Sequence, residues 1–125
     1  MILVLDAHTF LWWARNDAIL AADARAAISD PANDIVVSAA TIWELEIKRA
    51  QGKLLAPPDL LEIVDAEGFT CLPVSGGDAT AAARLPAHHR DPFDRMLIAQ
   101  AARLDATLVT RDAAFDAYDI EVLPA

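Results

Sequence analysis

Short apolar runs alternate with segments of helical periodicity along the chain. Five short apolar runs are typical of strands that are buried on both faces of a sheet. They cover residues 2–5, 35–37, a stretch around Leu72, 107–110 and 120–123. Between the runs, apolar spacing and turn residues predict helices over residues 9–15, 21–28, 39–51, 58–66 and 78–85, and a helix that starts at Pro92. Strands that alternate with helices predict an α/β domain built around a parallel sheet.

The strongest local signal is the segment at residues 91–95, which reads Asp-Pro-Phe-Asp-Arg. Asp91 is a good N-cap and the proline suits the first helical position, so Asp94 falls in the first turn. A helical projection at about 100° per residue puts Asp94 on the apolar side, between Ile98 and Ala101. A carboxylate that faces the protein interior is costly without a cation, a metal or several hydrogen bonds. The position of Asp94 therefore needs an explanation.

Further acidic residues follow the predicted strands, and in parallel sheets the binding crevice forms at the carboxyl ends of the strands. Asp6 closes the first run and Asp112 follows the fourth, so the two share one rim if those strands are neighbours. Either residue could instead simply cap the helix that follows it. Glu44 or Glu46 would add a fourth acid; Glu44 could also end a capping box or pair with Lys48, and the spacing does not choose between the two glutamates.

Carboxylates that converge in a crevice repel one another unless a cation is present. Oxygen-only ligands select Mg²⁺ or Mn²⁺ over Zn²⁺, and Mg²⁺ in particular keeps several waters and takes phosphate oxygens. Such a site hydrolyses phosphodiester bonds with a metal-activated water as the nucleophile.

Length, composition and net charge predict the number of domains, the location and the partners of the protein. The length of 125 residues, 55% of them hydrophobic, predicts one domain over residues 1–125. No apolar run approaches the ~20 residues that span a bilayer, and the first residues lack the features of a signal peptide, so we expect a cytoplasmic protein without a membrane segment. The net charge of −9 opposes nucleic-acid binding overall and suits a basic partner. The single Cys71 is expected to fill the core.

The histidines and tryptophans carry weaker signals. No pair of histidines has the spacing of a helical zinc site, so we interpret all three as loop or solvent-exposed residues: His8, His88 and His89. The tryptophans are interpreted as core residues rather than a base-stacking platform, with one of the adjacent pair at an interface: Trp12, Trp13 and Trp43.

Taken in order, these motifs resemble the PIN-domain ribonucleases, specifically the VapC-like toxins of bacterial toxin–antitoxin pairs. The similar segments are residues 3–6, 11–13, 37–40, 42–44, 52–54, 85–86, 91–95, 97–101 and 108–112, of which 91–95 is the most specific. The resemblance implies a three-layer α/β/α fold with strand order 3-2-1-4-5. It also implies a homodimer and an antitoxin whose C-terminal segment covers the active site.

The resemblance also implies roles for particular residues. The family's four acids map onto Asp6, Glu44, Asp94 and Asp112, which favours Glu44 over Glu46. Asp6 and Asp94 would be the main ligands of Mg²⁺, for which Mn²⁺ can substitute, and the other two acids would complete the pocket directly or through water. Supporting hydroxyls would come from Ser38, Thr110 and, because Ala7 stands where many relatives have a hydroxyl residue, Thr9.

The expected function is therefore a Mg²⁺-dependent endoribonuclease toxin that leaves 5′-phosphate and 3′-hydroxyl ends. Three clustered basic residues are the candidates for contact with the RNA backbone: Lys48, Arg49 and Lys53. One alternative is a non-catalytic α/β interaction module. A phospho-receiver domain is a weaker one, because the chain lacks an acid pair after the first strand and has no lysine after Lys53.

Overall fold

The computed structural model describes residues 1–125 and contains one five-stranded parallel sheet with the strand order β3-β2-β1-β4-β5. The strands are β1 (Ile2–Leu5), β2 (Asp34–Ser38), β3 (Thr70–Leu72), β4 (Thr107–Thr110) and β5 (Glu121–Pro124). The helices are α1 (Ala7–Ala14), α2 (Ala22–Ser29), α3 (Ala39–Ala50), α4 (Leu60–Ala66), α5 (Gly76–Ala83) and α6 (Pro92–Leu104), with a 3₁₀ turn η1 (Ala113–Ala117). The predicted fold class and strand order are confirmed.

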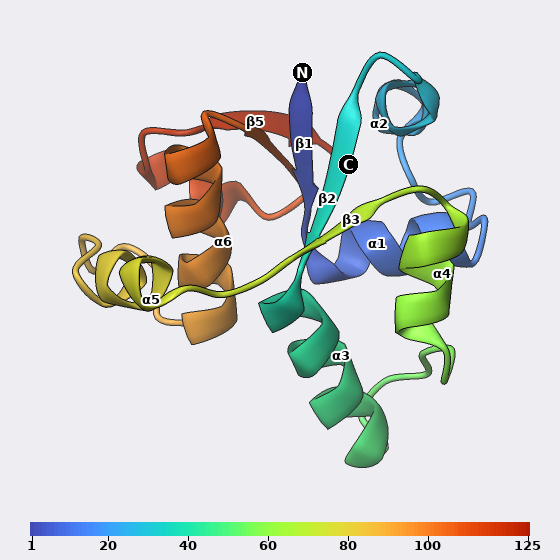
Figure 1. The fold of residues 1–125 in the computed structure, drawn as a ribbon, viewed down its shortest axis with the longest axis horizontal. Coiled ribbons are helices and arrows are strands. Elements are labelled where there is room, and N and C mark those ends of the chain that lie inside the picture. Colours follow the sequence, from blue (N-terminus) through green and yellow to red (C-terminus); the bar gives the residue numbers. More distant parts are fainter.

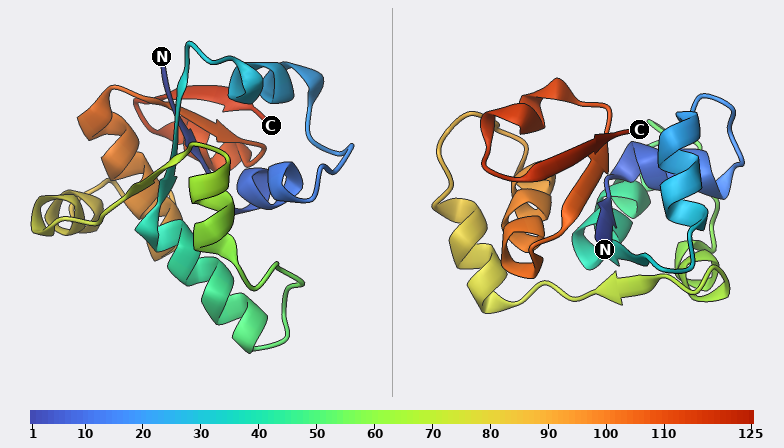
Figure 2. Two further views of the ribbon diagram at one scale, coloured as in Figure 1. Left: turned by 45° about the vertical axis from the view of Figure 1, so that its right-hand side comes forward. Right: turned by 90° about the horizontal axis from the view of Figure 1, so that it is seen from above.

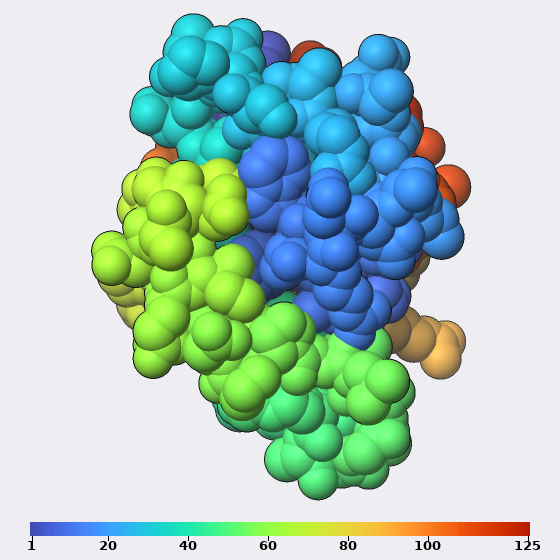
Figure 3. Space-filling view, turned by 90° about the vertical axis from the view of Figure 1, so that its right-hand side faces the viewer, coloured from blue at the N-terminus to red at the C-terminus, as the bar shows by residue number.

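Helices cover both faces of the sheet, which gives three layers (Figures 1 and 2). Side chains alternate across β1, so that Leu3 and Leu5 belong to a core under α1, α2 and α4, while Val4 belongs to a second core under α6 and η1. On the face of the sheet that α1 covers, the blue N-terminal segment that contains α1 lies beside the green segment that links α3 to α4 (Figure 3). Helix α3 continues from the carboxyl end of β2 and extends away from that edge of the sheet (Figure 1).

Local capping explains where the helices begin. Ser38 Oγ accepts a hydrogen bond from Ala40 N and starts α3, as predicted. Asp91 starts α6, because its Oδ1 accepts hydrogen bonds from the N–H groups of residues 93 and 94. The helix predicted over 78–85 instead covers Gly76–Ala83, because Ser75 and Asp78 form a capping box one turn earlier.

Some side chains lie elsewhere than predicted. Trp43 was expected in the core, but 63% of it is exposed. Trp12 and Trp13 are partly buried against the first core, and Cys71 is also only partly buried there. None of the helices combines the length and the apolar character that a membrane span requires.

Candidate active site

The acidic site lies at the carboxyl edge of the sheet, where β1 and β4 end side by side. Leu5 of β1 pairs with Val109 of β4, and Asp6 N donates a hydrogen bond to Val109 O just beyond this pair. Asp6 and Asp112 therefore share one rim, as the sequence predicted for neighbouring strands. The first turn of α6 brings Asp94 to the same rim.

The cavity at this edge has a volume of about 140 Å³. Its lining includes Lys48, Phe115 and five carboxylate residues: Asp6, Glu44, Asp91, Asp94 and Asp112. The four acids predicted from the sequence thus converge. Asp91, which we had interpreted only as a helix cap, adds a fifth carboxylate.

Asp6 is held by hydrogen bonds to both of its oxygens. Its Oδ1 accepts from Thr9 N at 2.9 Å, so the capping alternative is also correct, and its Oδ2 accepts from Thr110 Oγ1 at 2.6 Å. The Thr110 hydroxyl in turn accepts from Asp112 N at 3.1 Å, and it thereby connects the two acids. The hydroxyl of Thr9 instead donates to Val109 O at 3.0 Å.

The other predicted supporting hydroxyl, that of Ser38, caps α3 and has no hydrogen bond to any of the acids. Asp112 also has a capping role, because its Oδ1 accepts from Ala114 N at 2.9 Å. Of the three predicted hydroxyls, only that of Thr110 contacts an acid of the site directly.

Packing of α3 distinguishes the two glutamates that the sequence left open. Glu44 is buried and its Oε2 lies 2.8 Å from Lys48 Nζ, which raises the lysine pKa chiefly through this hydrogen bond. Glu46 pairs with Arg49 and does not line the cavity. The capping-box alternative for Glu44 is wrong, because Ser38 is the N-cap of α3.

The three predicted RNA-contacting residues do not act as one group in the structure. Lys48 lines the acidic cavity. Arg49 is engaged by Glu46 and also donates a hydrogen bond to Pro57 O at 2.7 Å. Lys53 is exposed after the end of α3.

Asp94 is the electrostatic centre of the cluster. Burial raises its pKa, and the nearby carboxylates of Asp91, Glu44, Asp6 and Asp112 raise it further, to about 7. Without a cation, this carboxyl group is therefore protonated about half of the time at neutral pH. The inward position predicted from the helical projection accounts for this shift.

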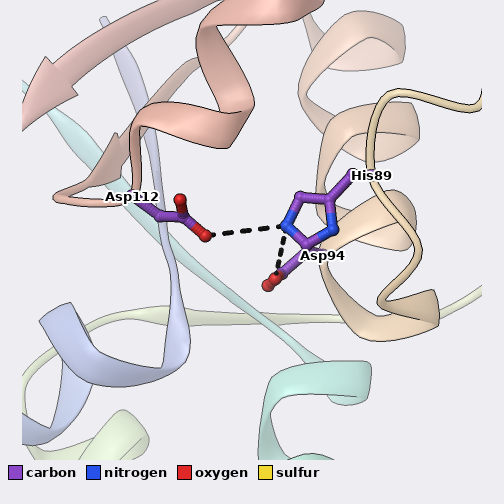
Figure 4. Close-up of side chains that lie close together, drawn as sticks. All are labelled: His89, Asp94 and Asp112. Atoms are coloured by element: carbon purple, nitrogen blue, oxygen red, sulfur yellow. Dashed lines mark ion pairs between the residues drawn. The ribbon is translucent and has the colours of Figure 1, made fainter.

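His89 lies in a loop, as predicted, but its side chain lies beside the acids of the site rather than in solvent. Figure 4 shows its ring between Asp94 and Asp112, with Nε2 at 3.0 Å from Asp94 Oδ2 and 3.6 Å from Asp112 Oδ2. Only 14% of the side chain is exposed. No helical or metal-ligand spacing marks this residue, and its closeness in sequence to Asp91 is the one signal that could have indicated it.

The donor set fits a hard divalent cation. Carboxylate oxygens dominate the cavity lining, and their mutual repulsion, expressed in the raised pKa of Asp94, is the charge that such a cation would neutralise. Polar side-chain atoms of Asp94, Asp112 and His89 lie within 4.8 Å of one another. Four or more carboxylates with few other donors favour Mg²⁺ or Mn²⁺ over Zn²⁺.

Fold and site together define the class: a three-layer α/β domain with a carboxylate cluster at the carboxyl edge of a five-stranded parallel sheet. Comparison with protein families makes this specific, because the model of the PIN domain matches residues 3–121. The chain belongs to the PIN domain family, which confirms the resemblance inferred from its motifs.

Several solved structures have the same fold. VapBC2 from Rickettsia felis, bound to a promoter DNA fragment, is 14% identical with a TM-score of 0.71, covering 100% of this chain and 99% of that one. DNA-bound VapBC from Salmonella typhimurium is 18% identical with a TM-score of 0.71, covering 99% and 98%. VapBC-5 of Mycobacterium tuberculosis, of the VapBC toxin–antitoxin family, is 23% identical with a TM-score of 0.64, covering 99% and 98%. Among curated proteins, none is significantly similar.

Proposed function

We propose that this protein is a Mg²⁺-dependent endoribonuclease and the toxin of a toxin–antitoxin pair, acting as the single domain of residues 1–125. The observation that carries the proposal is the convergence of four other carboxylates around Asp94, whose pKa is raised to about 7 by burial and by these neighbours. Membership of the PIN family and the likeness to VapBC structures support it.

In this proposal Asp6 and Asp94 are the main ligands of Mg²⁺, or of Mn²⁺ in its place, and Glu44 and Asp112 complete the site directly or through water. The cation would supply Lewis acidity for phosphodiester hydrolysis. Water adds to phosphorus, the bond to the 3′-oxygen breaks and that oxygen takes a proton, which leaves 5′-phosphate and 3′-hydroxyl ends.

The protein's own contacts hold the site in place for this reaction. Thr110 fixes the orientation of Asp6 through the 2.6 Å hydrogen bond, and Lys48 keeps Glu44 in the cavity. Lys48, which lines the cavity, and the exposed Lys53 are the proposed contacts to the RNA backbone, whereas Arg49 is held by Glu46. RNAs of translation are the proposed targets, which places the activity in the cytoplasm.

We propose two protein partners. A net charge of −9 and an acidic cavity would attract a basic antitoxin segment that covers the site. A second copy of the chain would bind the apolar groove of about 460 Å³ between the starts of α3 and α6. Trp43 and Val74 leave large apolar surfaces exposed in this groove, and their burial would favour a homodimer.

The test is a cleavage assay with purified, antitoxin-free protein and total cellular RNA in Mg²⁺ or EDTA, followed by mapping of the new ends. We expect discrete cuts in Mg²⁺, and none in EDTA or with Asp94→Asn. Asp65→Asn is the matched control, because Asp65 is exposed on α4 and outside the cavity. If wild type binds Mg²⁺ but cuts no RNA, the nuclease proposal is wrong; if it binds neither Mg²⁺ nor RNA, the interaction module becomes the better interpretation.

A further inference from the structure

The loop before α6 holds His89 at four points. His89 N donates to Tyr118 Oη at 2.8 Å, and His89 O accepts from Arg95 Nη1 at 3.1 Å. The ring lies against Phe115, with 5.5 Å between the ring centroids, and Nδ1 accepts from Asp91 N at 3.2 Å. An imidazole fixed in this way is oriented before any ligand arrives.

The same two side chains, those of Arg95 and Tyr118, also hold the loop itself. Arg95 also donates to the carbonyls of Pro86, Ala82, Ala83 and Leu85, and Tyr118 Oη donates to Pro86 O at 2.7 Å. Side chains from α6 and from the residue directly after η1 thus hold the loop in place. The position of His89 beside Asp94 and Asp112 is thus fixed by the folded protein.

The hydrogen bond from Asp91 sets the tautomer of the imidazole. Because Asp91 N–H donates to Nδ1, that nitrogen presents its lone pair, and the proton of the neutral ring is on Nε2. Nε2 is therefore a hydrogen-bond donor, and it has no lone pair to offer a metal. The imidazole therefore places a hydrogen-bond donor, Nε2–H, beside the carboxyl groups of Asp94 and Asp112.

This donor has no hydrogen-bond partner within the protein. Nε2 is buried and, despite lying 3.0 Å from Asp94 Oδ2, forms no hydrogen bond of acceptable geometry. The other oxygen of Asp112 is already used to cap η1. A buried N–H without an acceptor is unfavourable, so its position beside Asp94 and Asp112, two acids that line the cavity, indicates an acceptor that comes with the substrate.

We propose that His89 is a substrate-binding residue, whose Nε2–H donates to a non-bridging oxygen of the phosphate at the acidic site. This inference rests on the proposed function. A phosphate is the acceptor that suits both parts of the cavity, because its oxygens accept hydrogen bonds from fixed N–H groups and also bind the divalent cations that carboxylates hold. His89 would thereby orient the phosphate relative to Asp6 and Asp94.

Two variants separate the two nitrogens of the ring. The amide oxygen of His89→Asn can accept from Asp91 N in place of Nδ1, but the variant has no donor at the position of Nε2. The amide N–H of His89→Gln reaches the position of Nε2. We expect His89→Asn to lower kcat by about 10²-fold, the usual effect of losing one preorganised donor, and His89→Gln to recover most of that loss.

Binding measurements complete the test. We expect Mn²⁺ affinity, followed by electron paramagnetic resonance, to stay within about twofold of wild type in both variants, since the proposal gives His89 no ligand role. In Ca²⁺, which is chosen to allow binding without cleavage, His89→Asn should bind a fluorescent RNA oligonucleotide about tenfold more weakly than wild type. Thermal unfolding of each variant checks that the loop still folds.

The outcomes distinguish this inference from the proposed function. If His89→Asn binds and cleaves RNA like wild type, the inference is wrong; if it loses Mn²⁺ affinity, His89 is a metal ligand. Equal losses in both variants would show a structural role for the ring. If wild type cleaves no RNA but binds it in Ca²⁺ and His89→Asn binds less, the nuclease proposal fails and the phosphate contact stands. If wild type does not bind RNA, both fail.

Discussion

The replacement Asp94→Asn should make the metal-free protein more stable. In the folded state the ionised Asp94 is penalised by burial and by four neighbouring carboxylates, and its pKa is raised from 3.8 to about 7. Asparagine has nearly the same shape and no charge, so it removes the repulsion while it keeps the packing. Because Asp94 lowers the stability of the metal-free protein, its presence indicates a role other than stabilising the fold.

The magnitude follows from the linkage between protonation and folding. The difference between 3.8 and about 7 corresponds to about 4 kcal/mol of lost stability above pH 7, where the carboxyl group is ionised in both states. As the pH falls below 7 the folded state takes up the proton first, so stability returns, and at pH 5 wild type has regained more than half of it. The advantage of Asp94→Asn should shrink from about 4 kcal/mol at pH 8 to about 2 kcal/mol at pH 5.

The assay is thermal unfolding in EDTA at both pH values, followed by circular dichroism. For a chain of this length the difference at pH 8 amounts to an increase in Tm on the order of 10 °C. Asp65→Asn, an exposed acid in α4, controls for the loss of one negative charge from an acidic protein. The repulsion around Asp94 is not as described if Asp94→Asn gains no more stability over wild type than Asp65→Asn at pH 8. The same follows if the stability gained by Asp94→Asn does not decrease at pH 5.

Three further predictions follow from single contacts. Thr110→Val removes the hydroxyl that connects Asp6 and Asp112, and should weaken Mn²⁺ binding and RNA cleavage by about 10- to 100-fold. Asp78→Asn removes the charge of a buried carboxylate whose pKa is lowered to about 2, chiefly by its hydrogen bond with Arg103. The variant should lose about 2 kcal/mol of unfolding free energy at pH 7, measured by urea unfolding. In wild type the stability that this ionised carboxylate contributes should be lost as the pH falls from 3.8 through about 2. Trp43→Glu places a charge in the apolar groove and should convert a dimer into a monomer in light scattering.

Each of these has a matched control. Thr80→Val, on the exposed face of α5, should leave metal binding unchanged, and an equal effect of both threonine variants would contradict the role given to Thr110. Asp78→Asn should cleave RNA at the wild-type rate, because Asp78 does not line the acidic cavity. Leu61→Glu, which is 56% exposed on α4, should keep the dimer; if Trp43→Glu keeps it too, the groove is not the dimer contact.

Much of the fold could be predicted from the sequence because its signals are local. Buried parallel strands are continuous apolar runs, and capping residues mark the starts of α3 and α6, so these elements agree with the structure within a few residues. The same property explains why Asp6, Asp94 and Asp112 were predictable, since each stands directly at the end of a strand or the start of a helix. Trp43 was not predictable in this way, because exposure depends on which surface its neighbours leave uncovered.

The rest of the site depends on contacts between distant residues. The helical spacing of α3 does not choose between Glu44 and Glu46, and only the packing of that helix determines which one enters the cavity. His89 is placed by Tyr118, 29 positions away, and by Arg95 contacts to carbonyls of the preceding loop. No periodicity or local motif encodes such contacts, so the sequence could give His89 only the default interpretation of a loop residue.

The hydrogen bond between Asp6 and Thr110 joins residues 104 positions apart. The site can therefore form only after nearly the whole chain between them has been synthesised. During synthesis β1 emerges early, whereas its neighbour in the sheet, β4, and Asp112 after it emerge late. Domains generally fold as units, so the sheet is completed only when β4 is available. A nascent chain that has not been translated through Asp112 therefore has no complete carboxylate cluster. For an enzyme proposed to cut the RNAs of translation, the ribosome that makes it is not exposed to its activity until nearly all of this sheet has been translated.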